Sequence, residues 1–169
     1  LYGFTVLGIR FEDTSKAVGV LIPVSQDELE QFDEREIGYD RHCVSSKQIT
    51  SFSDSKLWKH GTIWVYIPTN PGAPSSDCPV PQSYLDTILR GCFDVHVAFG
   101  HCFLKYTKWN LNGDDDDDDD DETYHLLDDR SKPIYPRGDS EWSLENAGRV
   151  DILIQECLPK LLAVRRTIY

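Results

Sequence analysis

The sequence holds 169 residues, of which 40% are hydrophobic and 11% aromatic. We therefore expect a single domain that spans residues 1–169 and has a buried core. Its net charge is −12, but nine of the acids are Asp114–Asp121 and Glu122, and without them −3 remains. The rest of the chain is mildly acidic and has no basic stripe, which argues against nucleic-acid binding. It also has no run of about 18 apolar residues that could cross a membrane.

The first half of the chain is predicted to form strands around one short helix. Ser25 and Glu28 match a capping box, in which the serine hydroxyl accepts a free amide at the helix start and the glutamate reaches back. This pattern predicts a helix over residues 26–33. Four short β-branched or apolar runs are predicted to be strands, at residues 5–9, 18–22, 39–44 and 62–67.

The second half is predicted to be helical after a proline-rich loop at residues 69–81. Apolar residues recur at helical spacing from Tyr84 to Cys92, while Gly91 and Gly100 leave open whether this helix continues to Phe103. A further apolar stripe runs over residues 150–161, where Pro159 is expected to end or kink the helix. Strands followed by helices are typical of an α+β domain.

The run of eight aspartates has two interpretations. Adjacent carboxylates repel one another and do not pack, which predicts a solvated, disordered acidic insertion at about 112–123. The alternative is a tract that binds calcium or a basic protein. Calcium loops use ligands at spaced positions with a turn glycine, so the disordered insertion is favoured.

The segment Phe32–Arg41 carries the strongest chemical signal. It reads Phe-Asp-Glu-Arg-Glu-Ile-Gly-Tyr-Asp-Arg and follows the run Gly19–Val24 and the short helix. Taken alone, acids and an arginine at a helix end are typical of a solvated terminus with local ion pairs. Asp33 and Glu34 are expected to be such surface acids.

In its order of elements this region resembles the γ-glutamylcyclotransferase superfamily, in which a strand and a helix lead to a Leu/Phe-Asp-x-x-Glu segment. Residues 81–86 with Gly91 and Cys92 are similar to a later helix of that family. Residues 129–137 are similar to a C-terminal segment of some algal, plant and microbial members. The resemblance implies an α+β fold with a mixed β-barrel-like sheet and a few packed helices.

The resemblance also implies an activity, with Glu36 as the catalytic carboxylate. Such an enzyme cyclises the γ-glutamyl group of a peptide or amine to 5-oxoproline and releases the amine, a reaction of glutathione metabolism. One carboxylate serves both proton transfers, and ring closure within one molecule has a high effective molarity. Tyr39 and Tyr84 are the candidates for binding the γ-glutamyl substrate, although tyrosines are more often packed in a core or rim.

One feature of the family is missing from the sequence. Family members begin with a Tyr-Gly-Ser loop whose backbone amides bind the substrate and stabilise developing negative charge. Here Tyr2-Gly3 is followed by Phe4 and lies too close to Gly19, so we expect the loop to lie upstream of Leu1. Two alternatives stay open: a non-catalytic binding or regulatory module of the same fold, and an unrelated acidic interaction protein.

Neither a metal nor a cofactor is expected. The five cysteines are scattered and form no C-x-x-C pair, which argues against zinc and against a disulfide framework and favours a reducing, cytoplasmic setting. The five histidines show no metal-ligand spacing and no nearby nucleophile motif.

Overall fold

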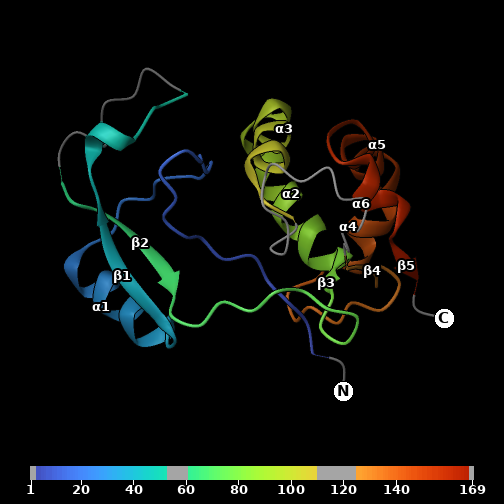
Figure 1. The fold of residues 1–169 in the computed structure, drawn as a ribbon, viewed down its shortest axis with the longest axis horizontal. Coiled ribbons are helices and arrows are strands. Elements are labelled where there is room, and N and C mark those ends of the chain that lie inside the picture. Colours follow the sequence, from blue (N-terminus) through green and yellow to red (C-terminus); the bar gives the residue numbers. More distant parts are fainter. Residues whose placement is uncertain (1–2, 53–60, 110–124, 168–169) are drawn as a thin grey trace. The chain divides into compact units, whose positions relative to one another are not determined.

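A computed structural model describes residues 3–52, 61–109 and 125–167 of the chain (Figure 1). They belong to two compact units: a helical unit of residues 1–7, 14–18 and 72–169, and a hairpin unit of residues 8–13 and 19–71. The predicted α+β class is confirmed. Over the described residues neither small sheet closes into a barrel. The single domain over residues 1–169 stays a prediction, and the acidic insertion lies outside the described residues.

The hairpin unit consists of one helix and one antiparallel pair of strands. Helix α1 (Gln26–Arg35) begins at the predicted capping box, because Ser25 accepts from the amide of Glu28 and the Glu28 side chain accepts from the amide of Ser25. Strands β1 and β2 pair along their whole length, with Tyr39 opposite Pro68. The bounds are Tyr39–Val44 for β1, Ile63–Pro68 for β2 and Ser46–Gln48 for the short 3-10 helix η1.

The two strands predicted at residues 5–9 and 18–22 are wrong. Residues 3–25 contain only a turn at residues 13–14 and otherwise no regular structure. β-branched residues favour a strand only where a neighbouring strand supplies hydrogen bonds, and no described segment pairs with residues 18–22. Val20 and Ile22 accordingly remain 62% and 63% exposed.

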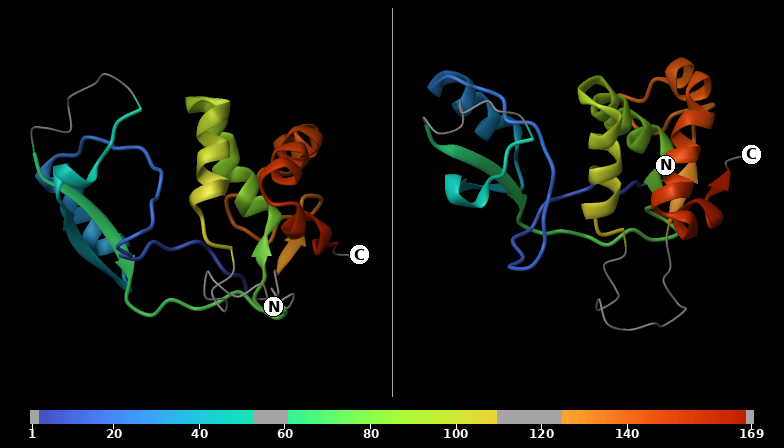
Figure 2. Two further views of the ribbon diagram at one scale, coloured as in Figure 1. Left: turned by 45° about the horizontal axis from the view of Figure 1, so that its top comes forward. Right: turned by 90° about the horizontal axis from the view of Figure 1, so that it is seen from above.

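The helical unit is built from three short parallel strands and five helices within the described residues (Figure 2). The strands lie in the order β3-β4-β5. Their bounds are Val80–Pro81 for β3, Leu126–Asp128 for β4 and Arg166–Thr167 for β5. The helices are α2 (Gln82–Val95), α3 (Val97–Tyr106), α4 (Ser140–Glu145), α5 (Ala147–Cys157) and α6 (Pro159–Ala163).

Helix boundaries in this unit follow from capping and packing. The predicted long helix ends at His96, whose Nδ1 accepts from the amide of Ala98 and so starts α3. Gly91 and Gly100 stay inside helices, and a Cβ at Gly100 would come within 3.2 Å of Leu153. Pro159 separates α5 from α6, as predicted.

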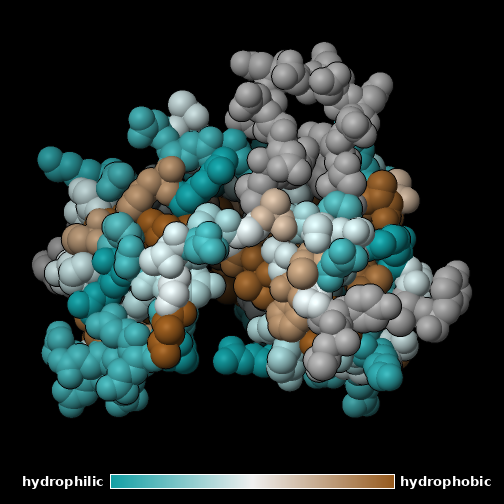
Figure 3. Space-filling view, turned by 60° about the horizontal axis from the view of Figure 1, so that its bottom comes forward, coloured by the Kyte–Doolittle hydropathy of each residue, from teal (hydrophilic) through white to brown (hydrophobic). Residues whose placement is uncertain are grey.

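The described residues of the two units differ in burial. The helical unit has a continuous apolar core, with members on α2, α3, α5 and β4. Its fully buried side chains include Leu85, Leu89, Leu104, Leu126, Val150 and Ile154. Of the described residues of the hairpin unit only Leu29 is buried. On the face drawn in Figure 3, brown, apolar residues lie beside teal, hydrophilic ones.

Candidate active site

The backbone of Glu36 is fixed on both sides. Its amide donates to the carbonyl of Phe32 at 2.9 Å, so the residue caps the C-terminus of α1. Gly38 has a φ of +93°, which only glycine adopts readily, and this turn lets the amide of Tyr39 donate to the Glu36 carbonyl at 3.1 Å. The amide and hydroxyl of Thr69 both donate to the Gly38 carbonyl at 2.9 Å. Glu36 is therefore held between a helix end and a closed hairpin.

The Glu36 side chain has one engaged oxygen and one open one. Its Oε1 accepts from Arg35 Nε at 2.9 Å and Nη2 at 2.7 Å, and the Arg35 guanidinium lies 4.4 Å from the centre of the Phe32 ring. Its Oε2 makes no hydrogen bond within the described residues. The side chain is 27% exposed. An anchored carboxylate with one accessible oxygen has the geometry of a proton-transfer group.

Asp33 and Glu34, the two acids that precede Glu36, have different surroundings. Asp33 Oδ1 accepts from the Tyr66 hydroxyl at 2.7 Å, and Oδ2 forms an ion pair with Arg41 Nη1 at 2.8 Å. The Arg41 guanidinium lies 4.6 Å from the centre of the Trp64 ring. Desolvation and the Asp33 carboxylate raise the pKa of Tyr66. Asp33 is thus engaged through both oxygens, whereas Glu34 is exposed.

The two tyrosines predicted to bind substrate lie in different units. Tyr39 begins β1, is half-buried and stands three residues after Glu36. Tyr84 lies on α2 of the helical unit, where its hydroxyl accepts from the amide of Leu7 at 3.1 Å and its ring makes an edge contact with Tyr135 at 4.9 Å. The structure therefore brings Tyr39, but not Tyr84, into the same unit as Glu36. Both substrate roles stay predictions.

A buried charge network in the helical unit was not anticipated. Arg130, 4% exposed, donates through Nε to Asp86 at 2.8 Å and through Nη2 to Asp151 at 2.9 Å. Arg165 donates twice to Asp151, at 2.7 and 2.8 Å, and Gln82 donates to Asp86 at 2.7 Å. Although burial lowers the pKa of Arg130, the carboxylates of Asp86 and Asp151 raise it overall. Burial raises the pKa of Asp151, but the two arginines lower it overall.

Asp129 makes a second buried polar contact at the start of α2. Its Oδ1 accepts from the Ser83 amide at 2.8 Å, and its Oδ2 accepts from the Ser83 hydroxyl at 2.6 Å and the Ile134 amide at 2.8 Å. The helix needs this because its N-cap residue is Pro81, which supplies no side-chain cap. The signal in the sequence was the pair Asp129-Arg130 directly after the apolar strand β4.

Cys157 and His101 form a third cluster, between α5 and α3. The sulfur lies 3.4 Å from His101 Nδ1, and His101 Nε2 lies 3.9 Å from a Glu156 oxygen. Burial, followed by the Glu156 charge, raises the pKa of the Cys157 thiol. A protonated thiol is a poor nucleophile, so this cluster does not have the electrostatics of a cysteine active site.

Two further observations limit the chemistry of the described residues. They contain no group of three or more His, Cys, Asp or Glu side chains that could hold a metal ion. No helix among them has the length and apolar character needed to cross a membrane.

Comparison of the chain with protein-family models, with curated proteins and with solved structures gives no match.

Proposed function

We propose that this chain carries the acid/base part of a γ-glutamylcyclotransferase-like enzyme, with Glu36 as the catalytic carboxylate. The observation that carries the proposal is the asymmetry of that carboxylate, in which Arg35 engages Oε1 and no described residue hydrogen-bonds Oε2. The barrel-like fold that the resemblance implies belongs to the same proposal.

The proposed reaction needs two proton transfers at Oε2 of Glu36. The α-amine of the γ-glutamyl group attacks its own side-chain carbonyl and loses a proton to Oε2, so a ring C–N bond forms. The same proton then passes to the nitrogen of the leaving amine as the original amide bond breaks. 5-Oxoproline and a free amine are the products, and the carboxylate returns to its ionised form.

Arg35 is the positioning residue in this scheme. Its two charge-assisted hydrogen bonds hold Oε1, so the free oxygen keeps one direction while the proton moves. Tyr39 is the substrate-binding candidate in the same unit, since its amide is bonded to the Glu36 carbonyl and its ring is half-buried. Asp33 is less suitable because Tyr66 and Arg41 engage both of its oxygens. Glu36 keeps one oxygen without a hydrogen bond to any described residue.

The test is release of 5-oxoproline from a panel of γ-glutamyl dipeptides and γ-glutamyl amines by the purified full-length protein. Turnover that Glu36→Gln lowers by about a hundredfold or more supports the enzyme. Binding of a γ-glutamyl compound without turnover by the wild type would instead support the non-catalytic module. Neither binding nor turnover with any member of the panel would overturn both forms of the proposal.

A further inference from the structure

The helical unit has an open pocket that the proposed reaction does not use. Its volume is about 350 Å³, which is within the usual range for small-molecule sites. It is lined by a loop of three residues and by the C-terminal end of α3 with the two residues that follow. These are Thr14, Ser15, Lys16, Lys105, Tyr106, Thr107 and Lys108.

The lining is cationic in an acidic protein. Three of its seven residues are lysines and none is an acid, whereas the chain as a whole carries a charge of −12. Lys16 and Lys105 form no ion pair or hydrogen bond within the described part of the chain. Two ammonium groups that line one pocket and have no partner among the described residues favour an external anion.

Neutral donors stand beside these charges. The hydroxyls of Thr14 and Ser15 are exposed and make no hydrogen bond to any described residue. Each can donate to an anion oxygen. The pocket thus combines point charges with hydroxyl donors, which is a suitable set for a phosphate group.

The C-terminus of a helix ordinarily repels anions through its free carbonyls. At α3 two of these carbonyls are occupied. The Phe103 carbonyl accepts from the amide of Thr107 at 3.0 Å and from its hydroxyl at 2.7 Å, and the Leu104 carbonyl accepts from Trp109 Nε1 at 3.1 Å. Lys105 adds a positive charge in the last turn. The negative helix end is therefore partly neutralised where the pocket lies.

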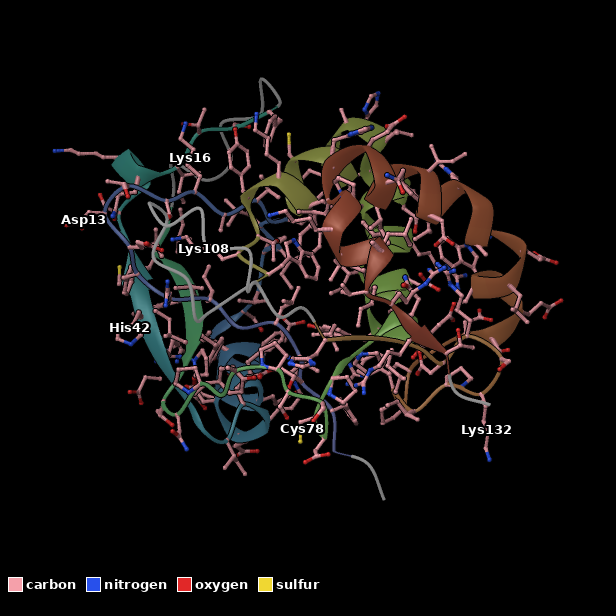
Figure 4. All side chains as sticks on the ribbon, turned by 45° about the vertical axis from the view of Figure 1, so that its right-hand side comes forward. Asp13, Lys16, His42, Cys78, Lys108 and Lys132 are labelled. Atoms are coloured by element: carbon pink, nitrogen blue, oxygen red, sulfur yellow. The ribbon has the colours of Figure 1, made fainter. Side chains whose placement is uncertain are left out.

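We propose that this pocket binds a compact anion of the phosphate class, such as inorganic phosphate or pyrophosphate, with Lys16 and Lys105 as the principal charged contacts. Lys16 and Lys108 of the pocket are labelled in Figure 4. The proposal is independent of Glu36, which belongs to the other unit.

The experiment is a calorimetric titration of the full chain with inorganic phosphate and pyrophosphate at low ionic strength. Lys16→Gln and Lys105→Gln should each weaken pyrophosphate binding by about three- to fivefold, the scale of an exposed charge pair. Lys132→Gln is the matched control, because Lys132 is exposed in the same unit, does not line the pocket and changes charge equally. It should leave affinity unchanged.

The same titration is made on a variant lacking residues 114–121. In the intact chain the eight carboxylates of this run begin six residues after Lys108. A tethered polyanion competes with a free anion at high effective concentration, so the deletion removes that competitor from the titration. Saturable binding to either protein that Lys16→Gln and Lys105→Gln weaken and Lys132→Gln does not supports the site. Equal loss with all three variants would reduce it to general charge attraction, and no binding to either protein would remove it.

Discussion

The helical unit and the hairpin unit use their charged residues in opposite ways. In the helical unit Arg130, Asp86 and Asp129 are buried and every one of them is hydrogen-bonded. In the hairpin unit Asp33 and Glu36 lie at the surface or half-buried, and Ile37 beside them is 87% exposed. The first set of charges is therefore enclosed within a packed core, whereas the second stays in contact with solvent.

The largest effect should come from the buried network. Arg130→Met leaves Asp86 buried without its ionic partner, so we expect the free energy of unfolding to fall by about 3–5 kcal/mol. Arg41→Met is the counterpart in the hairpin unit, where the arginine is 28% exposed and pairs with a more exposed acid. It should cost about 1 kcal/mol or less. Chemical denaturation measures the free energy of unfolding of both variants. Equal losses would contradict the difference between the two units.

A second pair of changes compares the hydrogen bonds of the two units. Asp129→Ala removes the acceptor for three hydrogen bonds and leaves the amides of Ser83 and Ile134 buried without partners, which should cost about 2–4 kcal/mol. Asp33→Ala removes one exposed hydrogen bond and one ion pair and should cost about 1 kcal/mol. Shifts in the denaturation midpoint decide between them. A costlier Asp33 change would show that the hairpin unit is the more tightly built.

The smallest effect compares an open with a packed position inside the helical unit. A Cβ at Gly91 meets nothing within 4 Å, so Gly91→Ala should stabilise the protein by about 0.5–1 kcal/mol through helix propensity. At Gly100 the added Cβ would press on Leu153 at 3.2 Å and approach Phe93 at 3.4 Å, which should cancel that gain. Thermal unfolding of the two variants is the measurement. An equal gain at both positions would mean that the α3–α5 contact is loosely packed.

Local signals in the sequence predicted helices α1, α2 and α5 and the two strands of the hairpin, but neither α4 nor the pairing of those strands. The Ser25–Glu28 capping box, the apolar spacing of α2 and the stop at Pro159 depend on residues close together in the chain. The run Val18–Ile22 has strand propensity but no partner among the described segments, and propensity alone cannot supply one. Strand pairing depends on residues far apart, so the expected barrel-like sheet came from the resemblance and not from local patterns.

The candidate site was predictable in one respect only. The motif pointed to Glu36. The sequence did not show that Arg35 hydrogen-bonds Glu36 or that Asp33 pairs with Tyr66, 33 residues away, because both contacts depend on the folded arrangement of the side chains. The buried network was hidden for the same reason, since Arg130 reaches an acid 44 residues earlier. A sequence gives the charge of each residue but does not show whether its side chain is buried or exposed.

The role of Glu36 is tested by measuring 5-oxoproline release by Glu36→Gln and Glu34→Gln, on the substrate that the wild type turns over fastest. Both changes keep side-chain size, and circular dichroism of both variants is the control for folding. We predict turnover on the order of a hundredfold lower for Glu36→Gln, because the amide cannot accept the amine's proton. Glu34→Gln should stay within about twofold of the wild type, because its side chain is exposed. Full activity of Glu36→Gln, or loss of activity in Glu34→Gln alone, would contradict the assignment of Glu36.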